Sequence, residues 1–196
     1  MILIVGLGNP GIKYRNNRHN AGHMFINYLV NELTGSSVSA KATADKRVNG
    51  LNIIKTNCYM NMSGIFVKKL TTNYKLQTTN LIIVHDDLDI PLGKFHIQFA
   101  SGPQLHNGLE SIEDHLRSKD FWRVRIGIDA RLARRSSLPT GRQVDEGGKP
   151  EQKIPGEIYT LQNFLPDEKK LLETEIFPKI FTQLKLFLKT QFKVTI

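Results

Sequence analysis

Cysteine is nearly absent from this chain of 196 residues, in which Cys58 stands alone. A single cysteine cannot form an internal disulfide, so disulfide-stapled secreted scaffolds are excluded and a reducing compartment is indicated. The sequence also lacks a G-x-S-x-G segment, and no Cys-His signature surrounds Cys58. Covalent catalysis through a serine or cysteine nucleophile is therefore not expected.

Long hydrophobic runs are missing as well. The opening MILIVGLGNPG is interrupted by glycine after five apolar residues, and it carries neither a basic segment nor a cleavage site. No stretch approaches the roughly 20 apolar residues of a transmembrane helix. We expect a cytoplasmic protein without a signal peptide or a membrane segment.

Negative charge is in short supply. The chain has 27 lysines and arginines against 18 aspartates and glutamates, which gives a formal net charge of +9. A basic chain is drawn to polyanions such as nucleic acids, although a solubilising surface charge explains the composition equally well. The length and the 40% of hydrophobic residues suit one domain and are short for two.

Strands and helices are expected to alternate along the chain. Apolar runs and alternating segments predict strands, while apolar residues at helical spacing predict helices. The expected strands are 2–5, 51–54, 80–85, 94–99 and 122–128, and the expected helices are 19–33, one from about 63, 106–116 and one from about 166. This order predicts an α/β fold, with a twisted mixed, largely parallel sheet flanked by helices and residues 1–196 in a single domain.

Two segments late in the chain have distinct compositions. Residues 130–154 are rich in Arg, Gly, Pro and Ser without an apolar period, which predicts a flexible insertion. From about residue 166, Asp167 and Glu168 precede a series of lysines, the arrangement that favours a helix through its dipole. Pro178 is expected to kink or break this C-terminal helix.

Gly6, Gly8 and Gly11 satisfy the G-x-G-x-x-G fingerprint of dinucleotide-binding proteins directly after a predicted strand. In that fingerprint the third glycine lies inside a helix, whereas Pro10 and Gly11 predict a turn here, and the acidic end of a second strand is missing. No cofactor is therefore expected. The glycines instead allow a tight loop to present Asn9 at the end of a core strand.

His19 and His23 are four residues apart, as in the zinc-binding H-E-x-x-H pattern. Asn20 stands where that pattern needs its glutamate, and no third ligand is evident, so no metal is expected. At a helix N-terminus the dipole favours a neutral His19 that can accept a proton, which suits a general base. A histidine that only caps the helix is the alternative, and the local sequence favours it modestly.

Asp86 follows a predicted buried strand, where a carboxylate can orient a histidine by accepting its hydrogen bond. A turn or cap residue is the alternative. Asn61 and Asn107 precede predicted helices and join Asn9 at the rim of the sheet. Asparagine is a common N-cap, but three amides that both donate and accept hydrogen bonds suit a site for water and a peptide backbone.

Four blocks of the sequence are distinctive together: GLGNPGIKYRNNRHNAG at 6–22, YMNMSG at 59–64, HDDLD at 85–89 and HNGL at 106–109. In order and approximate spacing they resemble the motifs of the bacterial peptidyl-tRNA hydrolase family, with Asn17 in place of the usual threonine. The resemblance extends from residue 2 to about residue 128. Several independent motifs make coincidence an inadequate explanation.

The resemblance implies a monomeric esterase that cuts the bond between a peptide and tRNA, at the acceptor end and 3′ terminus, without metal or cofactor. His19 is then the catalytic base, Asp86 orients it, and a water attacks the ester carbonyl. The implied substrate contacts are Asn9 and Asn107 for the 3′ nucleotide and the peptide, Asn61 for the water and the carbonyl, and Tyr14, Tyr59, Met60 and His106 along the cleft.

The sequence departs from the family where tRNA is held. SGPQL at 101–105 replaces a glycine-rich stretch, Gln98 stands where a basic residue commonly clamps the 5′ phosphate, and Glu110 replaces a frequent lysine. Arg125 is then the better phosphate ligand by position. The arginines of 130–154 offer compensating charge as a hypothesis, against the alternative of a solvated, dispensable loop.

Two other classes of protein compete with a hydrolase. A non-catalytic RNA-binding protein on the same scaffold would explain the altered 101–105 loop and the basic insertion, but it would not need both His19 and Asp86. A nucleotide-binding oxidoreductase would require dinucleotide binding. Ester cleavage by the wild-type chain separates the first possibility from the hydrolase.

Overall fold

The computed structural model describes residues 1–35, 46–48, 50–131 and 154–196. Its strands are β1 (Ile2–Gly6), β2 (Lys46–Val48), β3 (Leu51–Lys55), β4 (Leu81–Pro91), β5 (Phe95–Phe99) and β6 (Trp122–Asp129). Its helices are α1 (Ala21–Thr34), α2 (Ser63–Asn73), α3 (Asn107–Leu116), α5 (Gly156–Thr160), α6 (Pro166–Leu171) and α7 (Phe177–Phe192). Short 3-10 turns are η1 (Ile12–Tyr14), η2 (Arg18–Asn20), η3 (Met60–Met62) and η4 (Thr78–Asn80), and η5 (Leu172–Ile176) is a π-helical segment.

The sheet has the order β2-β3-β1-β4-β6-β5. β3, β1, β4 and β6 are parallel to one another, while β2 and β5 pair antiparallel at the two edges. All five residues of β1 are buried, as expected for a central strand covered on both faces. The predicted α/β fold with a mixed, largely parallel sheet is confirmed.

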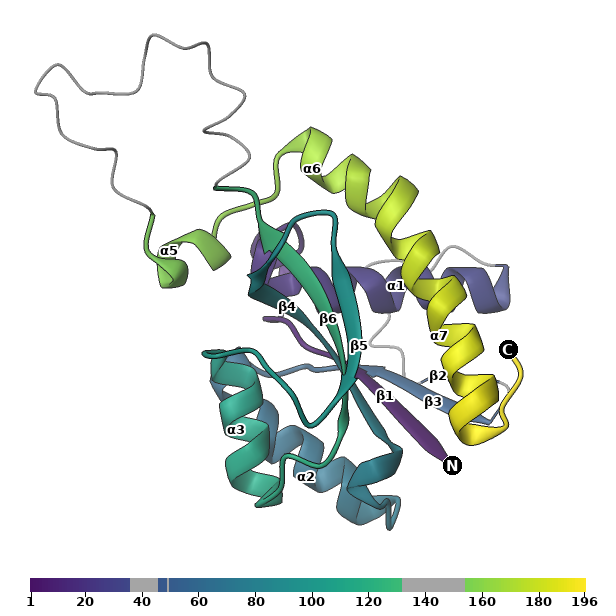
Figure 1. Ribbon diagram of the computed structural model, residues 1–196. Helices are drawn as coiled ribbons and strands as arrows, with labels where there is room; N and C mark the ends of the chain where they lie inside the picture. The colour runs from purple at the N-terminus through teal and green to yellow at the C-terminus, as the bar shows by residue number, and fades with distance from the viewer. Residues whose placement is uncertain (36–45, 49, 132–153) are drawn as a thin grey trace, which may run out of the picture.

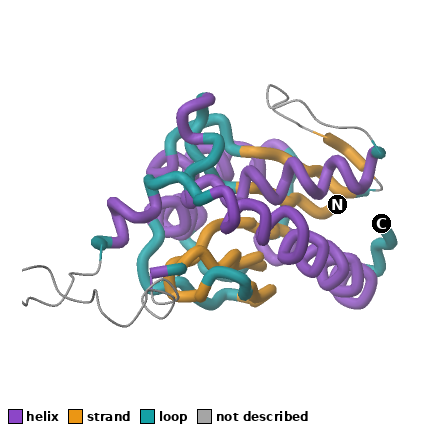
Figure 2. Tube along the Cα trace, turned by 90° about the horizontal axis from the view of Figure 1, so that it is seen from above, coloured by secondary structure: helices purple, strands orange, loops and turns teal. Residues whose placement is uncertain are grey.

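Helices cover the two faces of the sheet in two separate hydrophobic clusters (Figure 1). One face packs on α1 and α7 through residues such as Phe25 and Phe177, and the other packs on α2 and α3 through Val67 and Ile112. Both termini lie at the same end of the molecule (Figure 2). Because β1 begins at that end, the carboxyl ends of the parallel strands lie at the opposite one, where ligands collect in open α/β sheets.

The strand that carries the acidic cluster is longer than the sequence suggested. The predicted strand 80–85 stops at His85, whereas β4 continues to Pro91. Asp86 is therefore a strand residue, paired with Ile126 of β6, and is not a turn residue beyond the strand. Pairing with β6 continues through Asp87 and, after an irregularity in the register, resumes at Pro91.

Close packing brings α1 against the ends of β1 and β4. A Cβ atom on Gly22 would lie 2.3 Å from the carbonyl oxygen of Val84 and 2.6 Å from that of Leu7. Only glycine permits this approach. The preceding turn η2 is thereby held beside β4, while the GLGNPG segment forms a loop with α1 starting as late as Ala21. The dinucleotide fingerprint, in which the helix begins at the glycines, does not apply.

Several further elements differ from the sequence prediction. The edge strand β2 and the one-and-a-half-turn helix α5 were not predicted, because three and five residues are too few for a periodic pattern. The predicted insertion 130–154 lies almost entirely outside the described residues. Near Pro178 the chain forms the π-helical segment η5 and then α7, whose first turn accommodates the proline because the first helical positions need no N–H donor.

None of the helices in the described ranges combines the length and the hydropathy that crossing a bilayer requires.

Candidate active site

Three buried side chains meet near the carboxyl ends of the parallel strands. Asp86 comes from β4, His19 from η2, and His106 from the residue before α3. Nδ1 of His19 lies 2.9 and 3.0 Å from the two carboxylate oxygens of Asp86, and Nε2 of His106 lies 3.1 Å from Oδ1. One carboxylate thus holds two imidazole rings, whose centroids are 5.0 Å apart.

The hydrogen bonds define the protonation of this cluster. Burial by itself raises the pKa of Asp86, but the two neighbouring histidines outweigh it and hold that pKa far below its ordinary value. Asp86 is therefore an ionised acceptor, and Nδ1–H of His19 donates to it. Nε2 of His19 has no hydrogen-bond partner among the described residues and is left with its lone pair. A ring nitrogen oriented in this way can accept a proton.

The pKa of His19 moves upward in the folded protein. Burial lowers it, but the charge of Asp86 and the hydrogen bond to it together raise it above the ordinary value. The sequence argument from the helix dipole had the opposite direction and is wrong on this point. His19 lies in the turn before α1, and a carboxylate 2.9 Å away acts more strongly than the partial charge of a helix end.

His106 is bound on both of its ring nitrogens. Nδ1 accepts hydrogen bonds from the backbone N–H groups of Gly108 and Leu109, which caps α3, so Nε2 carries the proton that is donated to Asp86. His85 lies behind it, and its ring is 5.0 Å from that of His106. Burial first and the neighbouring His106 second lower the pKa of His85 well below its ordinary value, so this ring is neutral.

The glycine loop holds Asn9 in a fixed position. Its backbone N–H donates to Oδ1 of Asn20 and its carbonyl accepts from Nδ2 of Asn20, each at 2.9 Å. Its side-chain oxygen accepts the N–H of Met60 at 2.9 Å. The Asn9 amide NH2 group is thereby left to donate elsewhere. Asn20 was considered only as a missing zinc-site glutamate, and its position beside His19 in the R-H-N block was the signal that could have identified it.

The other predicted contact residues are distributed around this cluster. Tyr14 and Tyr59 contact each other edge to face, with ring centroids 6.4 Å apart. Met60 is buried, and a Cβ atom on Gly108 would meet its sulfur, so α3 packs directly on η3. Asn61 and Asn107 are exposed, in η3 and at the first position of α3. Their amides are free to contact a ligand, but the described structure gives them no hydrogen bond to the cluster.

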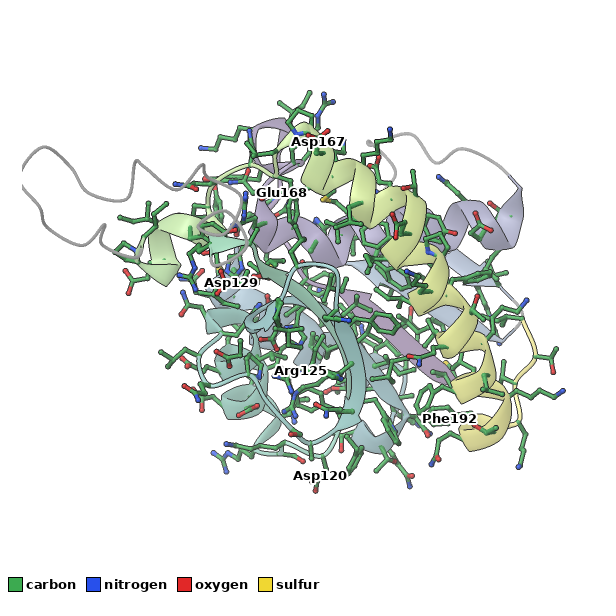
Figure 3. The ribbon with its side chains drawn as sticks, turned by 45° about the horizontal axis from the view of Figure 1, so that its top comes forward. Asp120, Arg125, Asp129, Asp167, Glu168 and Phe192 are labelled. Carbon is green, nitrogen blue, oxygen red and sulfur yellow. The ribbon has the colours of Figure 1, made fainter. Side chains whose placement is uncertain are left out.

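Arg125 lies on β6, where Figure 3 labels it. Its Nε donates to Asp87 and its Nη1 donates to Gln98, both at 2.7 Å. Its charge is therefore already partnered by a buried carboxylate, and Gln98 supports it as an acceptor. Phosphate binding by Arg125 remains a prediction.

Sequence reasoning missed a buried ion pair that holds the turn carrying His19. Arg18 of η2 is 1% exposed and its Nη2 lies 2.5 Å from Glu168, which Figure 3 places at the start of the C-terminal helical segment. The guanidinium also lies over the rings of Tyr159 and Phe164 and donates to the carbonyl of Asn163. A fully buried arginine has no sequence signal of its own, because arginine is ordinarily a surface residue.

His19, Asp86 and His106 also offer ligand atoms within 4.8 Å of one another, which is the spacing of a metal site. Two N–H donors on one carboxylate account for the same spacing without an ion. Among the described residues no other group of this kind occurs. The expectation that no metal is used stays a prediction.

Known proteins are similar to this chain over most of its length. A family model described as peptidyl-tRNA hydrolase matches residues 3–140. The peptidyl-tRNA hydrolase of Lawsonia intracellularis is 36% identical over 196 aligned positions, covering 96% of this chain and 88% of the relative. That of Sulfurovum sp. is 34% identical over 175 positions, covering 88% of this chain and 82% of the relative.

The fold has a solved counterpart as well. The crystal structure of a peptidyl-tRNA hydrolase from Acinetobacter baumannii superimposes with a TM-score of 0.73 at 26% identity, covering 98% of this chain and 91% of that chain. The fold and these similarities define the class of the protein as an α/β hydrolytic enzyme. The chain belongs to the peptidyl-tRNA hydrolase family.

Proposed function

We propose that this protein hydrolyses the ester bond between a peptide, or another N-blocked aminoacyl group, and tRNA, and so releases free tRNA for reuse. The observation that carries the proposal is the His19–Asp86 pair, in which Nδ1 is fixed by an ionised carboxylate and Nε2 is left to take a proton. The family membership of the chain supplies the substrate class.

His19 acts as the general base. Its Nε2 takes a proton from a water as the water oxygen attacks the ester carbonyl, and Asp86 stabilises the imidazolium that forms. When the tetrahedral intermediate collapses, the imidazolium gives the proton to the departing ribose oxygen. The acid and the free tRNA hydroxyl are then both formed, and the base is regenerated. No covalent intermediate with the protein is required.

Asparagine amides supply the remaining stabilisation. The amide of Asn9, held by Asn20 and Met60, can donate to an oxygen on the substrate, and Asn61 and Asn107 extend the set. Donors fixed before the reaction stabilise a developing oxyanion at little reorganisation cost. Asn61 places the water and the carbonyl, while Asn9 and Asn107 hold the 3′ nucleotide and the peptide.

The substrate is held along the cleft and beyond it. Tyr14, Tyr59, Met60 and His106 line the cleft on the peptide and nucleotide side. Arg125 contacts phosphate at the acceptor end, for which it would have to exchange part of its bond to Asp87. We further propose that the protein acts as a cytoplasmic monomer in a single domain.

Turnover by the wild-type chain tests the proposal. N-acetyl-aminoacyl-tRNA is incubated with the protein, and the released tRNA and acid are quantified against a no-enzyme control. We expect multiple turnovers without added metal. Binding of tRNA without cleavage would instead identify a non-catalytic RNA-binding protein on this scaffold.

A further inference from the structure

A cavity lies beside the Asn9 loop. It has a volume of about 350 Å³ and is lined by residues of that loop, of α1 and of the segment that follows β3. Asn9 and Asn20, which hydrogen-bond to each other, are among its lining residues, and Asn20 is next to His19 in the sequence. The catalytic mechanism uses none of the cavity's other lining residues.

The charged side chains that line this cavity are positive. Lys55 and Arg15 line it, and the described lining residues include no aspartate or glutamate. Lys55 is 8% exposed, and its ammonium group has one acceptor in the described part of the chain, Oδ1 of Asn27 at 2.8 Å. An ammonium group can donate three hydrogen bonds, so donors remain for a ligand in the cavity. A buried cation without a carboxylate partner is costly, and an anion would offset this cost.

The rest of the lining supports the same conclusion. Nε2 of His23 is hydrogen-bonded to Oγ1 of Thr56 at 2.9 Å. Burial and the charge of Lys55 lower the pKa of His23 to about 3, so His23 is neutral and adds no charge to the cavity. Pro10, Ile12 and Met24 supply an apolar wall. Apolar walls with a few polar groups at one end are typical of small-molecule sites, which range from about 300 to 1,000 Å³.

We infer that this cavity binds one nucleotide of the single-stranded 3′ end of the tRNA, with its phosphate on Lys55 and Arg15 and its base or sugar against Ile12 and Met24. The volume suits a single nucleotide, and the two cations suit one phosphodiester group. Because Asn9 and Asn20 line the cavity and Asn9 is a proposed substrate contact, a nucleotide bound there would lie close to the ester. The choice of RNA as the ligand rests on the proposed function.

A binding cycle tests the inference without requiring turnover. Deacylated tRNA and the same tRNA lacking its 3′ terminal nucleotides are titrated against wild-type protein and Lys55→Met by fluorescence anisotropy. We expect Lys55→Met to weaken binding of intact tRNA about tenfold or more and to leave the truncated tRNA nearly unaffected, since each change removes the same contact. Equal weakening of both tRNAs would overturn the inference.

Further variants control for folding and charge. Arg15→Gln alters an exposed side chain, so it should fold even if Lys55→Met does not. It should weaken the binding of intact tRNA and leave the binding of truncated tRNA nearly unaffected. Lys55→Arg should retain most of the affinity. Lys68→Met removes an exposed lysine of α2 and should not distinguish the two tRNAs. If Lys68→Met also lowered the affinity for intact tRNA alone, the inference would be contradicted, because the loss would then follow from the removal of any positive charge.

A competition experiment with a free nucleotide separates RNA binding from nucleotide binding. Adenosine 5′-monophosphate is titrated as a competitor against intact tRNA. Competition that depends on Lys55, together with the selective loss above, is the expected result. If the nucleotide binds in a Lys55-dependent way while the tRNA cycle shows no coupling, the cavity is a free-nucleotide site and the RNA assignment is wrong. If wild-type protein binds as expected but cleaves no ester, only the proposed function fails.

Discussion

Asp86 determines what His19 can do. It accepts from Nδ1 of His19 and from Nε2 of His106, and its pKa stays far below the ordinary value because the two rings outweigh its burial. The carboxylate therefore fixes both the tautomer and the orientation of the base. It also raises the pKa of His19, so the base is strengthened but becomes protonated at a higher pH.

This coupling predicts how the pH profile depends on Asp86. In the wild type, kcat/KM should fall as the pH drops below a His19 pKa that lies above the ordinary value. In Asp86→Asn the burial of His19 persists without the carboxylate, so the acid limb should move to lower pH while the plateau falls at least about 100-fold. Asp120→Asn, on an exposed loop, is the matched control. An unshifted acid limb in Asp86→Asn would show that Asp86 does not set the His19 pKa.

The residues of the site were predictable to different degrees. His19, Asp86, Asn9 and Met60 stand in distinctive sequence blocks, and the structure pairs His19 with Asp86 and Asn9 with Met60. The supporting contact of Asn20 was not predicted, because two hydrogen bonds between loop residues eleven positions apart leave no periodic pattern. The direction of the His19 pKa was wrong for a related reason: it depends on a distance, which the sequence does not contain.

At the scale of elements, the turn that carries His19 is joined to the C-terminal helices. Arg18 and Glu168, 150 positions apart, form a buried pair that joins η2 to α6. Glu168 also accepts from the backbone N–H of Leu165, which completes the start of α6. The position of His19 therefore depends on a helix outside the first 128 residues, where the family motifs are found.

Removing one member of this pair should be costly. Glu168→Ala leaves the Arg18 charge buried without its carboxylate, and we expect the free energy of unfolding to fall by about 3–5 kcal/mol. Glu173→Ala removes an exposed partner of Lys169 and should cost less than about 1 kcal/mol. Urea denaturation of both variants measures the difference. Similar losses in the two would mean that the buried pair does not hold η2.

His23 of α1 predicts a second property of this packing. Because burial and Lys55 lower its folded pKa to about 3, an unfolded chain binds a proton near pH 6.5 that the folded chain does not. The stabilisation is complete above pH 6.5 and is lost as the pH falls toward 3, by at most about 1.4 kcal/mol per pH unit. In His23→Gln the unfolding free energy should fall less steeply over this range. An unchanged slope, measured by urea denaturation at several pH values, would contradict the assignment.

The main strands and helices were predictable because their apolar periods are long. β1, α1 and β6 lie within one or two residues of the expected ranges. The predicted strand ended too early because acidic residues are typical of turns. In the structure β4 continues, since Asp86 is hydrogen-bonded to histidines and Asp87 to Arg125 inside the fold. Tertiary partners, not local preference, decided that boundary.

At the scale of the whole molecule, we expect the net charge to control the encounter with tRNA. The net charge of +9 predicts an affinity that falls with salt as counterions compete for the phosphates. Raising monovalent salt from about 50 to about 200 mM should lower the affinity for deacylated tRNA at least about tenfold, while kcat at saturating substrate changes little. Anisotropy titrations at four salt concentrations give the slope. A slope of zero would show that the basic surface does not contact the RNA.

The most direct test of the account is single-turnover hydrolysis of N-acetyl-aminoacyl-tRNA by His19→Ala, with deacylated-tRNA binding measured on the same preparation. If His19 is the general base, the rate of ester cleavage should fall by about 100-fold to 10,000-fold while tRNA affinity stays within about twofold of the wild type. Retention of most of the cleavage rate by a folded His19→Ala protein would contradict the account.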